Sequence, residues 1–116
     1  MNQKRDKLFP LSENAFYVLL CLYFHSPIHG YTIKKNIYEY SGHRLNLPTS
    51  SIYLILNRFV RTGIAKITHV DVPSPSKKHQ RVYYSITPDG INLFQAELER
   101  LKHLLQLPEE IRRKEG

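Results

Sequence analysis

Apolar residues recur at helical spacing in three stretches of the first 63 residues. The first stretch follows Ser12, a helix-capping residue, and ends before Pro27, which disfavours helical backbone in the residue preceding it. The second covers about residues 31–40, and the third starts within residues 47–51 and ends at Thr62-Gly63. We therefore predict three short helices, whose inward-facing apolar residues are Ala15, Phe16, Leu19, Leu20, Leu22 and Tyr23, then Tyr31, Ile33, Ile37 and Tyr38, and then Ile52, Ile55, Leu56, Phe59 and Val60.

The pattern changes to strict alternation after residue 63, which predicts two β-strands. The first strand covers residues 64–72 and the second covers residues 82–86, with Tyr84 facing the core. Pro73 and Pro75 argue against a two-residue turn between the strands, so we expect a loop of about eight residues there. A basic cluster occupies this loop and the start of the second strand: Lys77, Lys78, His79 and Arg81.

A fourth helix is predicted from Thr87-Pro88-Asp89-Gly90, a sequence typical of turns and helix starts, to about Leu107. Its apolar residues step by three, four, three and four positions, which is the heptad spacing of a helix that packs on another helix. This seam is more than the rest of the chain can cover, so we expect it to form a symmetric homodimer. The alternative is a helix that folds back on its own domain. The heptad seam consists of Ile91, Phe94, Leu98, Leu101 and Leu105.

The order helix, helix, helix, strand, loop, strand, helix is that of a winged helix-turn-helix domain with one appended helix. We expect an α+β, mostly helical fold with three helices, a two-stranded β-wing and a C-terminal dimerisation helix. The expected divisions are a flexible basic arm at 1–10, the winged helix-turn-helix DNA-binding domain at 11–88, the dimerisation helix at 89–108 and a charged tail at 109–116.

Positive charge is concentrated in the predicted arm and winged domain. Residues 1–88 hold twelve Lys and Arg against four Asp and Glu, whereas residues 89–116 hold five against six. The net charge of the whole chain is +7 at pH 7. A basic body beside a nearly neutral end indicates that the body meets a polyanion.

The third helix is the predicted recognition element for double-stranded DNA. Small hydroxyl residues at its start let backbone N–H groups approach a phosphate closely. The alternative is that these residues only cap the helix and that Tyr53 packs at the edge of the domain. The predicted DNA-binding residues are Thr49, Ser50, Ser51, Tyr53, Asn57 and Arg58 in this helix, and Lys77, Lys78, His79 and Arg81 in the wing, with Lys4, Arg5 and Lys7 as an accessory arm.

Other classes of function find little support in the sequence. The six His residues are scattered without metal-ligand spacing, and there is no Cys cluster, glycine-rich phosphate loop or nucleophile elbow. We therefore expect neither an enzyme nor a bound cofactor or metal. The longest nearly apolar run, residues 15–24, is too short to span a bilayer, and the N-terminus has no signal-peptide pattern. The single Cys21 is expected to be a buried apolar residue in a reducing compartment, which fits a cytoplasmic protein.

Four segments of the chain carry a further pattern: Ser26-Pro27-Ile28-His29-Gly30-Tyr31, Ser51-Ile52-Tyr53 with Leu56-Asn57-Arg58-Phe59, Gly63-Ile64, and Arg81-Val82-Tyr83-Tyr84-Ser85-Ile86-Thr87-Pro88-Asp89-Gly90. In this order they resemble PadR-type transcriptional regulators, over residues 11 to about 105. The resemblance is to the short branch of the family, in which the single C-terminal helix makes the homodimer. Ser51 and Tyr53 match a hydroxyl residue and a tyrosine of the family, and Arg58 matches a common basic residue. Asn57 stands where a lysine is frequent, and Thr49 and Ser50 replace the usual proline-glycine helix start.

The resemblance implies a sequence-specific DNA-binding transcriptional regulator, with a homodimeric repressor of a roughly palindromic operator as the leading hypothesis. In the family, ligands that relieve repression can bind at or near the dimer interface. A small-molecule effector is therefore a further candidate partner, although this chain has no Trp to offer a flat binding platform. Two alternatives use the same fold: a winged-helix module that binds protein, and a DNA-binding adaptor for plasmid or phage maintenance.

Overall fold

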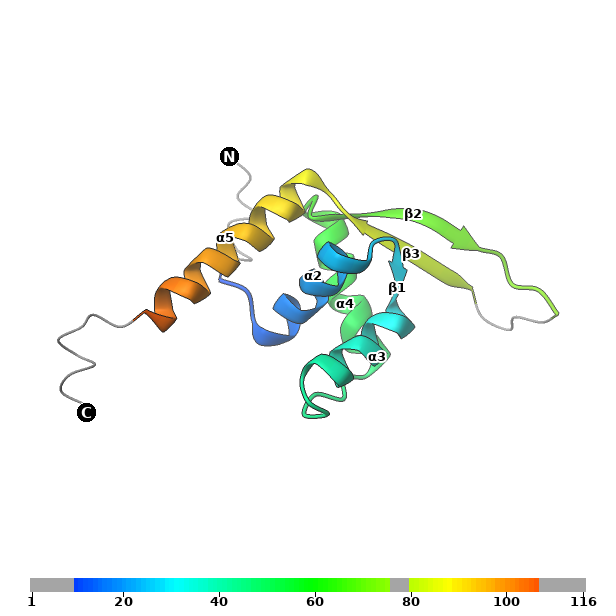
Figure 1. Ribbon diagram of the computed structural model, residues 1–116. Coiled ribbons are helices and arrows are strands. Elements are labelled where there is room, and N and C mark those ends of the chain that lie inside the picture. Colours follow the sequence, from blue (N-terminus) through cyan, green and yellow to red (C-terminus); the bar gives the residue numbers. More distant parts are fainter. Residues whose placement is uncertain (1–9, 76–79, 107–116) are drawn as a thin grey trace.

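The computed structural model describes residues 10–75 and 80–106 of the chain (Figure 1). Three helices, α2 (Glu13–His25), α3 (Gly30–Tyr40) and α4 (Thr49–Arg61), pack around one apolar core. These are the three helices that the apolar spacing predicts, with ends that agree to within a residue or two. The arrangement is the expected α+β, mostly helical one.

A three-stranded antiparallel sheet lies beside the helices in the order β1-β3-β2. Strands β2 (Ala65–Asp71) and β3 (Arg81–Ile86) are the predicted wing, and they extend away from the helices (Figure 1). The third strand, β1 (Ile28–His29), pairs with β3 and is not predicted by the sequence pattern, because two residues are too few to show alternation. The wing is therefore anchored to the helical body through an additional strand.

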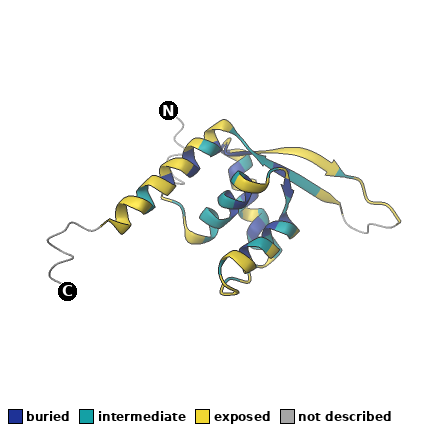
Figure 2. Cartoon of the chain, viewed as in Figure 1, coloured by how far each residue is buried: buried dark blue, intermediate teal, exposed yellow. Residues whose placement is uncertain are grey.

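The buried core joins all three helices to the start of the wing (Figure 2). Tyr84 of β3 is buried as predicted, and so is Cys21. Burial raises the pKa of the Cys21 thiol to about 12, so this cysteine behaves as a small apolar residue. The fully buried apolar residues are Val18, Leu19, Cys21, Leu22, Ile33, Ile37, Ile52, Leu56, Phe59 and Ile64.

Capping side chains fix where two of the helices begin. The Ser12 hydroxyl accepts a hydrogen bond from the N–H of Ala15 at 3.2 Å, which starts α2. The Thr87 hydroxyl accepts from the N–H of Gly90 at 3.1 Å and donates to the carbonyl of Ile64 at 3.0 Å. Thr87 therefore starts the last helix, α5 (Pro88–Leu105), and links it to Ile64, which lies between α4 and β2.

The first half of α5 packs on the helical body of the chain. Leu93, Phe94 and Glu97 are buried, and the ring of Phe94 stacks on Phe16 at 5.5 Å and on Tyr23 at 4.4 Å between centroids. We expected Phe94 in the heptad seam of a dimer, but only 2% of its surface is exposed. Its ring is covered by α2, so Phe94 offers almost no free apolar surface to another chain.

The second half of α5 runs beyond the helical body (Figure 1). The other members of the heptad seam differ in exposure along the helix: Ile91 and Leu101 are half-buried, Leu98 is exposed, and Leu105 is 84% exposed. Leu104 is exposed beside them. The helix thus changes from a core element to an uncovered apolar face along its own length.

Candidate nucleic-acid interface

The start of α4 has no side-chain cap. Its N-cap residue is Pro48, and no side chain accepts a hydrogen bond there. Thr49, Ser50 and Ser51 lie in the first turn, so the alternative that their hydroxyls only cap the helix is wrong. The backbone N–H groups of this first turn carry the partial positive charge of the helix dipole, which favours an anion at this end.

One face of α4 points outward and is mainly polar. The opposite face, made by Ile52, Leu56 and Phe59, is fully buried in the core. The hydrophobic anchor therefore fixes the rotation of the helix and with it the residues that face solvent. Those residues lie at steps of four, three, one and three positions: Ser50, Leu54, Asn57, Arg58 and Arg61. We call this set the outward face of α4.

The outward face contains the predicted Ser50, Asn57 and Arg58, together with two residues that were not predicted. Arg61 is exposed in the last turn, and Leu54 is 71% exposed at the middle of the face. Leu54 has the same chemistry as a core residue, so its apolar character gives no signal of a surface position. Only its offset of two positions from Ile52 and Leu56 could have indicated it.

Tyr53, another predicted DNA-binding residue, is half-buried where α4 meets α3 and the wing. A Cβ atom at Gly30 would lie 2.7 Å from Cζ of Tyr53, so the ring occupies space that only glycine leaves free. On the other side the Tyr53 ring lies 6.5 Å from that of Tyr84, whose pKa is raised by burial and by Tyr53. The ring of Tyr53 therefore packs α4 against α3 and the wing, as the domain-edge alternative anticipated.

Of the four predicted DNA-binding residues in the wing, Arg81 lies within the described residues. Arg81 is exposed at the start of β3, opposite Asp71 of β2. The predicted Lys77, Lys78 and His79, like the arm residues Lys4, Arg5 and Lys7, lie outside the described residues. The register shifts between Ile67 and His69, so the strict alternation predicted along β2 is wrong at this point.

His29 lies where the wing meets α3. Its Nδ1 accepts a hydrogen bond from the N–H of Thr32 at 3.4 Å, so the side chain of His29 caps α3. Its ring meets that of Tyr83 edge to face at 5.1 Å. Burial lowers the pKa of His29, and the charge of Arg81 lowers it further, while Asp71 opposes them. The site thus favours neutral His29.

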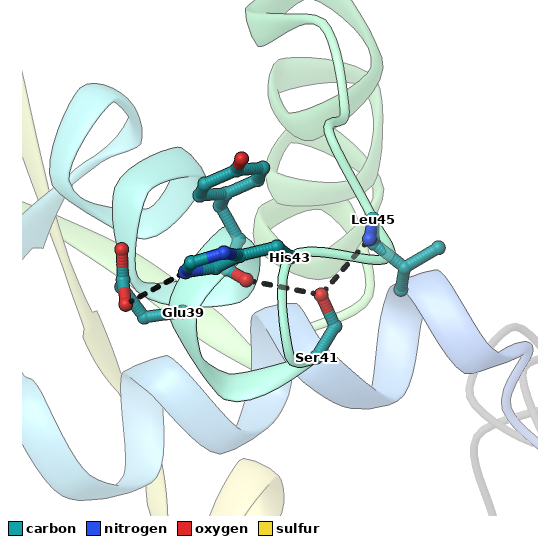
Figure 3. A network of polar contacts seen from close by, with 5 residues as sticks. Glu39, Ser41, His43 and Leu45 are labelled. Carbon is teal, nitrogen blue, oxygen red and sulfur yellow. Dashed lines mark hydrogen bonds and ion pairs between the residues drawn. The ribbon is translucent and has the colours of Figure 1, made fainter.

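The connection from α3 to α4 is held by polar contacts (Figure 3) and by Leu45 and Leu47, which pack against the core. The Ser41 hydroxyl donates to the carbonyl of Tyr38 at 3.2 Å and accepts from the N–H of Leu45 at 2.9 Å. His43 has a left-handed backbone with φ of 67°, its ring stacks on Tyr38 at 4.5 Å, and its Nε2 lies 3.3 Å from Oε2 of Glu39. These contacts give the connection a defined shape.

Lys34 extends this network to the start of α4. Its ammonium group donates to Oδ1 of Asn46 at 2.9 Å and to the carbonyl of Leu47 at 2.6 Å. Leu47 directly precedes Pro48, the N-cap of α4. Arg44 anchors the same connection to α2 through a 2.8 Å ion pair with Glu13. The position of the α4 start therefore depends on side chains that were not singled out from the sequence.

No group of three or more His, Cys, Asp or Glu residues within residues 10–75 and 80–106 is placed to hold a metal ion. Among the helices of the same residues, none has the length and apolar character needed to cross a membrane.

Comparison with protein families gives one match, the transcriptional regulator PadR-like family, over residues 18–96. No curated protein matches the sequence. The matched range includes α3, α4, the wing and the buried half of α5.

Solved structures of transcriptional regulators are similar to this chain. TA0346 from Thermoplasma acidophilum, described as a transcriptional regulator, is 26% identical with a TM-score of 0.64, covering 78% of this chain and 82% of that one. A PadR family regulator from Clostridium difficile R20291 is 18% identical with a TM-score of 0.68, covering 90% and 100%. Bacillus subtilis PadR, solved in complex with operator DNA, is 21% identical with a TM-score of 0.63, covering 86% and 52%.

Proposed function

Because this chain belongs to the PadR-like family of transcriptional regulators, we propose that it is a homodimeric repressor of a pseudo-palindromic operator. The family itself is one of DNA-binding transcriptional regulators and not of enzymes. The observation that carries the proposal is the outward face of α4, which presents Asn57 and Arg58 in the second half of a helix whose start has no side-chain cap. Side chains on such a face read base edges, and an uncapped helix start binds phosphate.

The wing supports a second contact with the same duplex. β2 and β3 extend from the body, and Arg81 is exposed where β3 begins (Figure 1). A basic wing that follows the phosphate backbone adds affinity without sequence preference. Lys77, Lys78 and His79 belong to this proposed contact because of their place in the sequence between the two strands.

The uncovered half of α5 supports the homodimer. Leu98, Leu101 and Leu105 follow one another at steps of three and four and leave an apolar face that the protomer does not cover. An identical helix from a second copy covers this face with the same residues, as a two-fold symmetric interface requires. Two copies then present two α4 helices to half-sites about 34 Å apart, one turn of B-form DNA.

A cavity of about 580 Å³ between α2 and α5 supports a small-molecule effector as a further partner. It is lined by apolar and aromatic side chains with a few charged groups, including Phe16, Tyr17, Leu20 and Arg100. Its volume falls in the range of about 300–1,000 Å³ typical of ligand sites. Thermal-shift screening of aromatic compounds tests this part separately, since it needs no operator.

Selection of bound duplexes from a random pool tests the proposal as a whole. We expect enrichment of sequences with two inverted half-sites, and affinity for them that falls steeply as salt concentration rises. A pool without enrichment, or binding that is insensitive to salt, contradicts the proposed DNA interface and favours a protein-binding module instead.

The dimer is tested by Leu98→Glu combined with Leu101→Glu. Charges on this face prevent its burial, so we expect a monomer in sedimentation and operator affinity reduced by at least about 100-fold, because half of the phosphate and base contacts are lost. The matched control, Ala96→Glu with His103→Glu, adds the same side chains to the opposite, exposed side of α5. A dimer that survives the seam variant shows that the interface lies elsewhere.

A further inference from the structure

We infer that Leu54 is a specificity-determining residue that contacts the C5-methyl group of a thymine in each operator half-site. This inference rests on the proposed function, because it assigns a base contact to the outward face of α4. Leu54 is 71% exposed at the centre of that face. Ser50, one turn earlier, and Asn57 and Arg58, one turn later, are exposed beside it.

Packing within the protomer does not account for Leu54. The core-facing side of α4 is complete without it, since Ile52, Leu56 and Phe59 are fully buried. Exposed single apolar residues are common on proteins, so exposure alone means little. The position is what distinguishes Leu54: it is the apolar member of a face whose other members are polar or basic.

The major groove offers few partners for such a side chain. A leucine has no hydrogen-bonding group, so it cannot read the donors and acceptors of the base edges. The thymine C5-methyl is the apolar feature that B-form DNA displays in this groove. A leucine at the centre of a recognition helix therefore favours thymine, and the neighbouring Asn57 and Arg58 read the flanking bases by hydrogen bonds.

The experiment uses the full chain and the operator obtained from the random-pool selection. Each thymine of the operator is replaced in turn by uracil, which removes the methyl group and leaves base pairing unchanged. For wild type we expect one position in each half-site at which uracil weakens binding by about fourfold, and by about 15-fold when both half-sites are changed, from the transfer free energy of one buried methyl-sized group. For Leu54→Ala we expect equal affinity for the thymine and uracil operators.

Controls separate this contact from general effects. Leu54 is exposed and alanine favours helix, so Leu54→Ala should fold normally, which circular dichroism and thermal unfolding verify. Val70→Ala truncates an exposed apolar residue on β2 and should retain the sensitivity to uracil. Selection with Leu54→Ala should lose the preference for thymine at that one position.

The outcomes distinguish the inference from the proposed function. If wild type and Leu54→Ala respond equally to uracil at every position, or if the selected half-site lacks a fixed thymine, Leu54 does not read a methyl group although the operator proposal stands. If wild type enriches no duplex at all, the proposed function itself fails, and the contact assigned to Leu54 fails with it.

Discussion

Glu97 is a charged residue with 1% of its surface exposed, and its replacement tests how α5 is fixed to the body. Its Oε1 accepts a hydrogen bond from the N–H of Leu11 at 2.5 Å, and its Oε2 accepts from Nε of Arg100 at 2.6 Å. Leu11 precedes α2, whereas Arg100 lies one turn further along α5. The carboxylate of Glu97 therefore joins the segment before α2 to the middle of α5.

The cost of Glu97→Ala follows from these two contacts. Removing one member of a buried ion pair costs about 3–5 kcal/mol in free energy of unfolding, because the remaining groups lose their partner. Arg100 is 33% exposed and regains water, which places the expected loss near the lower end, about 3 kcal/mol. For a domain of this size the melting temperature then falls by about 12 °C. Glu97→Gln keeps the volume and one acceptor, so we expect about half that loss.

Urea unfolding followed by circular dichroism measures the free energy of unfolding, at one fixed protein concentration because the proposed dimerisation would add to apparent stability. Glu99→Ala is the matched control, because Glu99 forms an exposed ion pair on the same helix, with 3.7 Å between its Oε1 and Nζ of Lys102. Its expected effect is below about 0.5 kcal/mol. A loss of under about 1 kcal/mol for Glu97→Ala refutes the reasoning, because it means that the buried carboxylate is not held by both partners.

Three further changes test the connections among α3, α4 and the wing. Lys34→Met should reduce the free energy of unfolding by about 1–2 kcal/mol, because the ammonium group of Lys34 binds the loop before α4. It should also weaken operator binding without changing the salt dependence of the affinity. Lys35→Met is the exposed control, and a weaker salt dependence for Lys34→Met would mean that Lys34 contacts a phosphate directly. Gly30→Ala should cost about 1–3 kcal/mol in urea unfolding, because its Cβ would lie 2.7 Å from the Tyr53 ring; an unchanged midpoint contradicts that clash. The pKa of His29 is lowered in the folded protein, so the unfolded protein, in which this pKa is about 6.5, binds the proton more readily. The stability that neutral His29 contributes is therefore present above about pH 6.5 and is lost as the pH falls below that value. His29→Asn keeps a capping side chain and should flatten the melting temperature between pH 7.5 and pH 5; the same slope as wild type would exclude His29 as its source.

The parts of the fold that the sequence predicts are those fixed by local chemistry. The helix starts at Ser12 and Thr87 follow from capping side chains, and both caps are present. The helix ends follow from Pro27 and from Gly63, whose φ of 78° is in the left-handed region that glycine favours. Such signals depend on a few neighbouring residues, so they can be read without knowledge of the tertiary structure.

The parts that the sequence does not predict depend on which element covers which face. The heptad spacing places Phe94 and Leu101 on the same side of α5. It does not predict that α2 covers Phe94 and leaves Leu101 only half-buried. The same limit applies to Glu97, which is buried because Leu11 and Arg100 satisfy its charge. β1 exists because β3 lies alongside it, 55 or so positions later in the chain.

The division of α5 links the proposed dimer to DNA recognition. Phe94 and Glu97 fix the first half of the helix to the body that carries α4, and Leu101 and Leu105 lie on the same continuous helix. A helix is stiff over this length, so the angle at which two copies of α5 cross sets the separation of the two outward faces of α4. Loosening the Glu97 contacts should therefore broaden the half-site spacing accepted in selection, even in a variant that remains folded and dimeric. Altered half-site sequence at unchanged spacing is instead the expected effect of changes on α4, such as Leu54→Ala. The two classes of variant thus separate the residues that set the half-site spacing from those that set the half-site sequence.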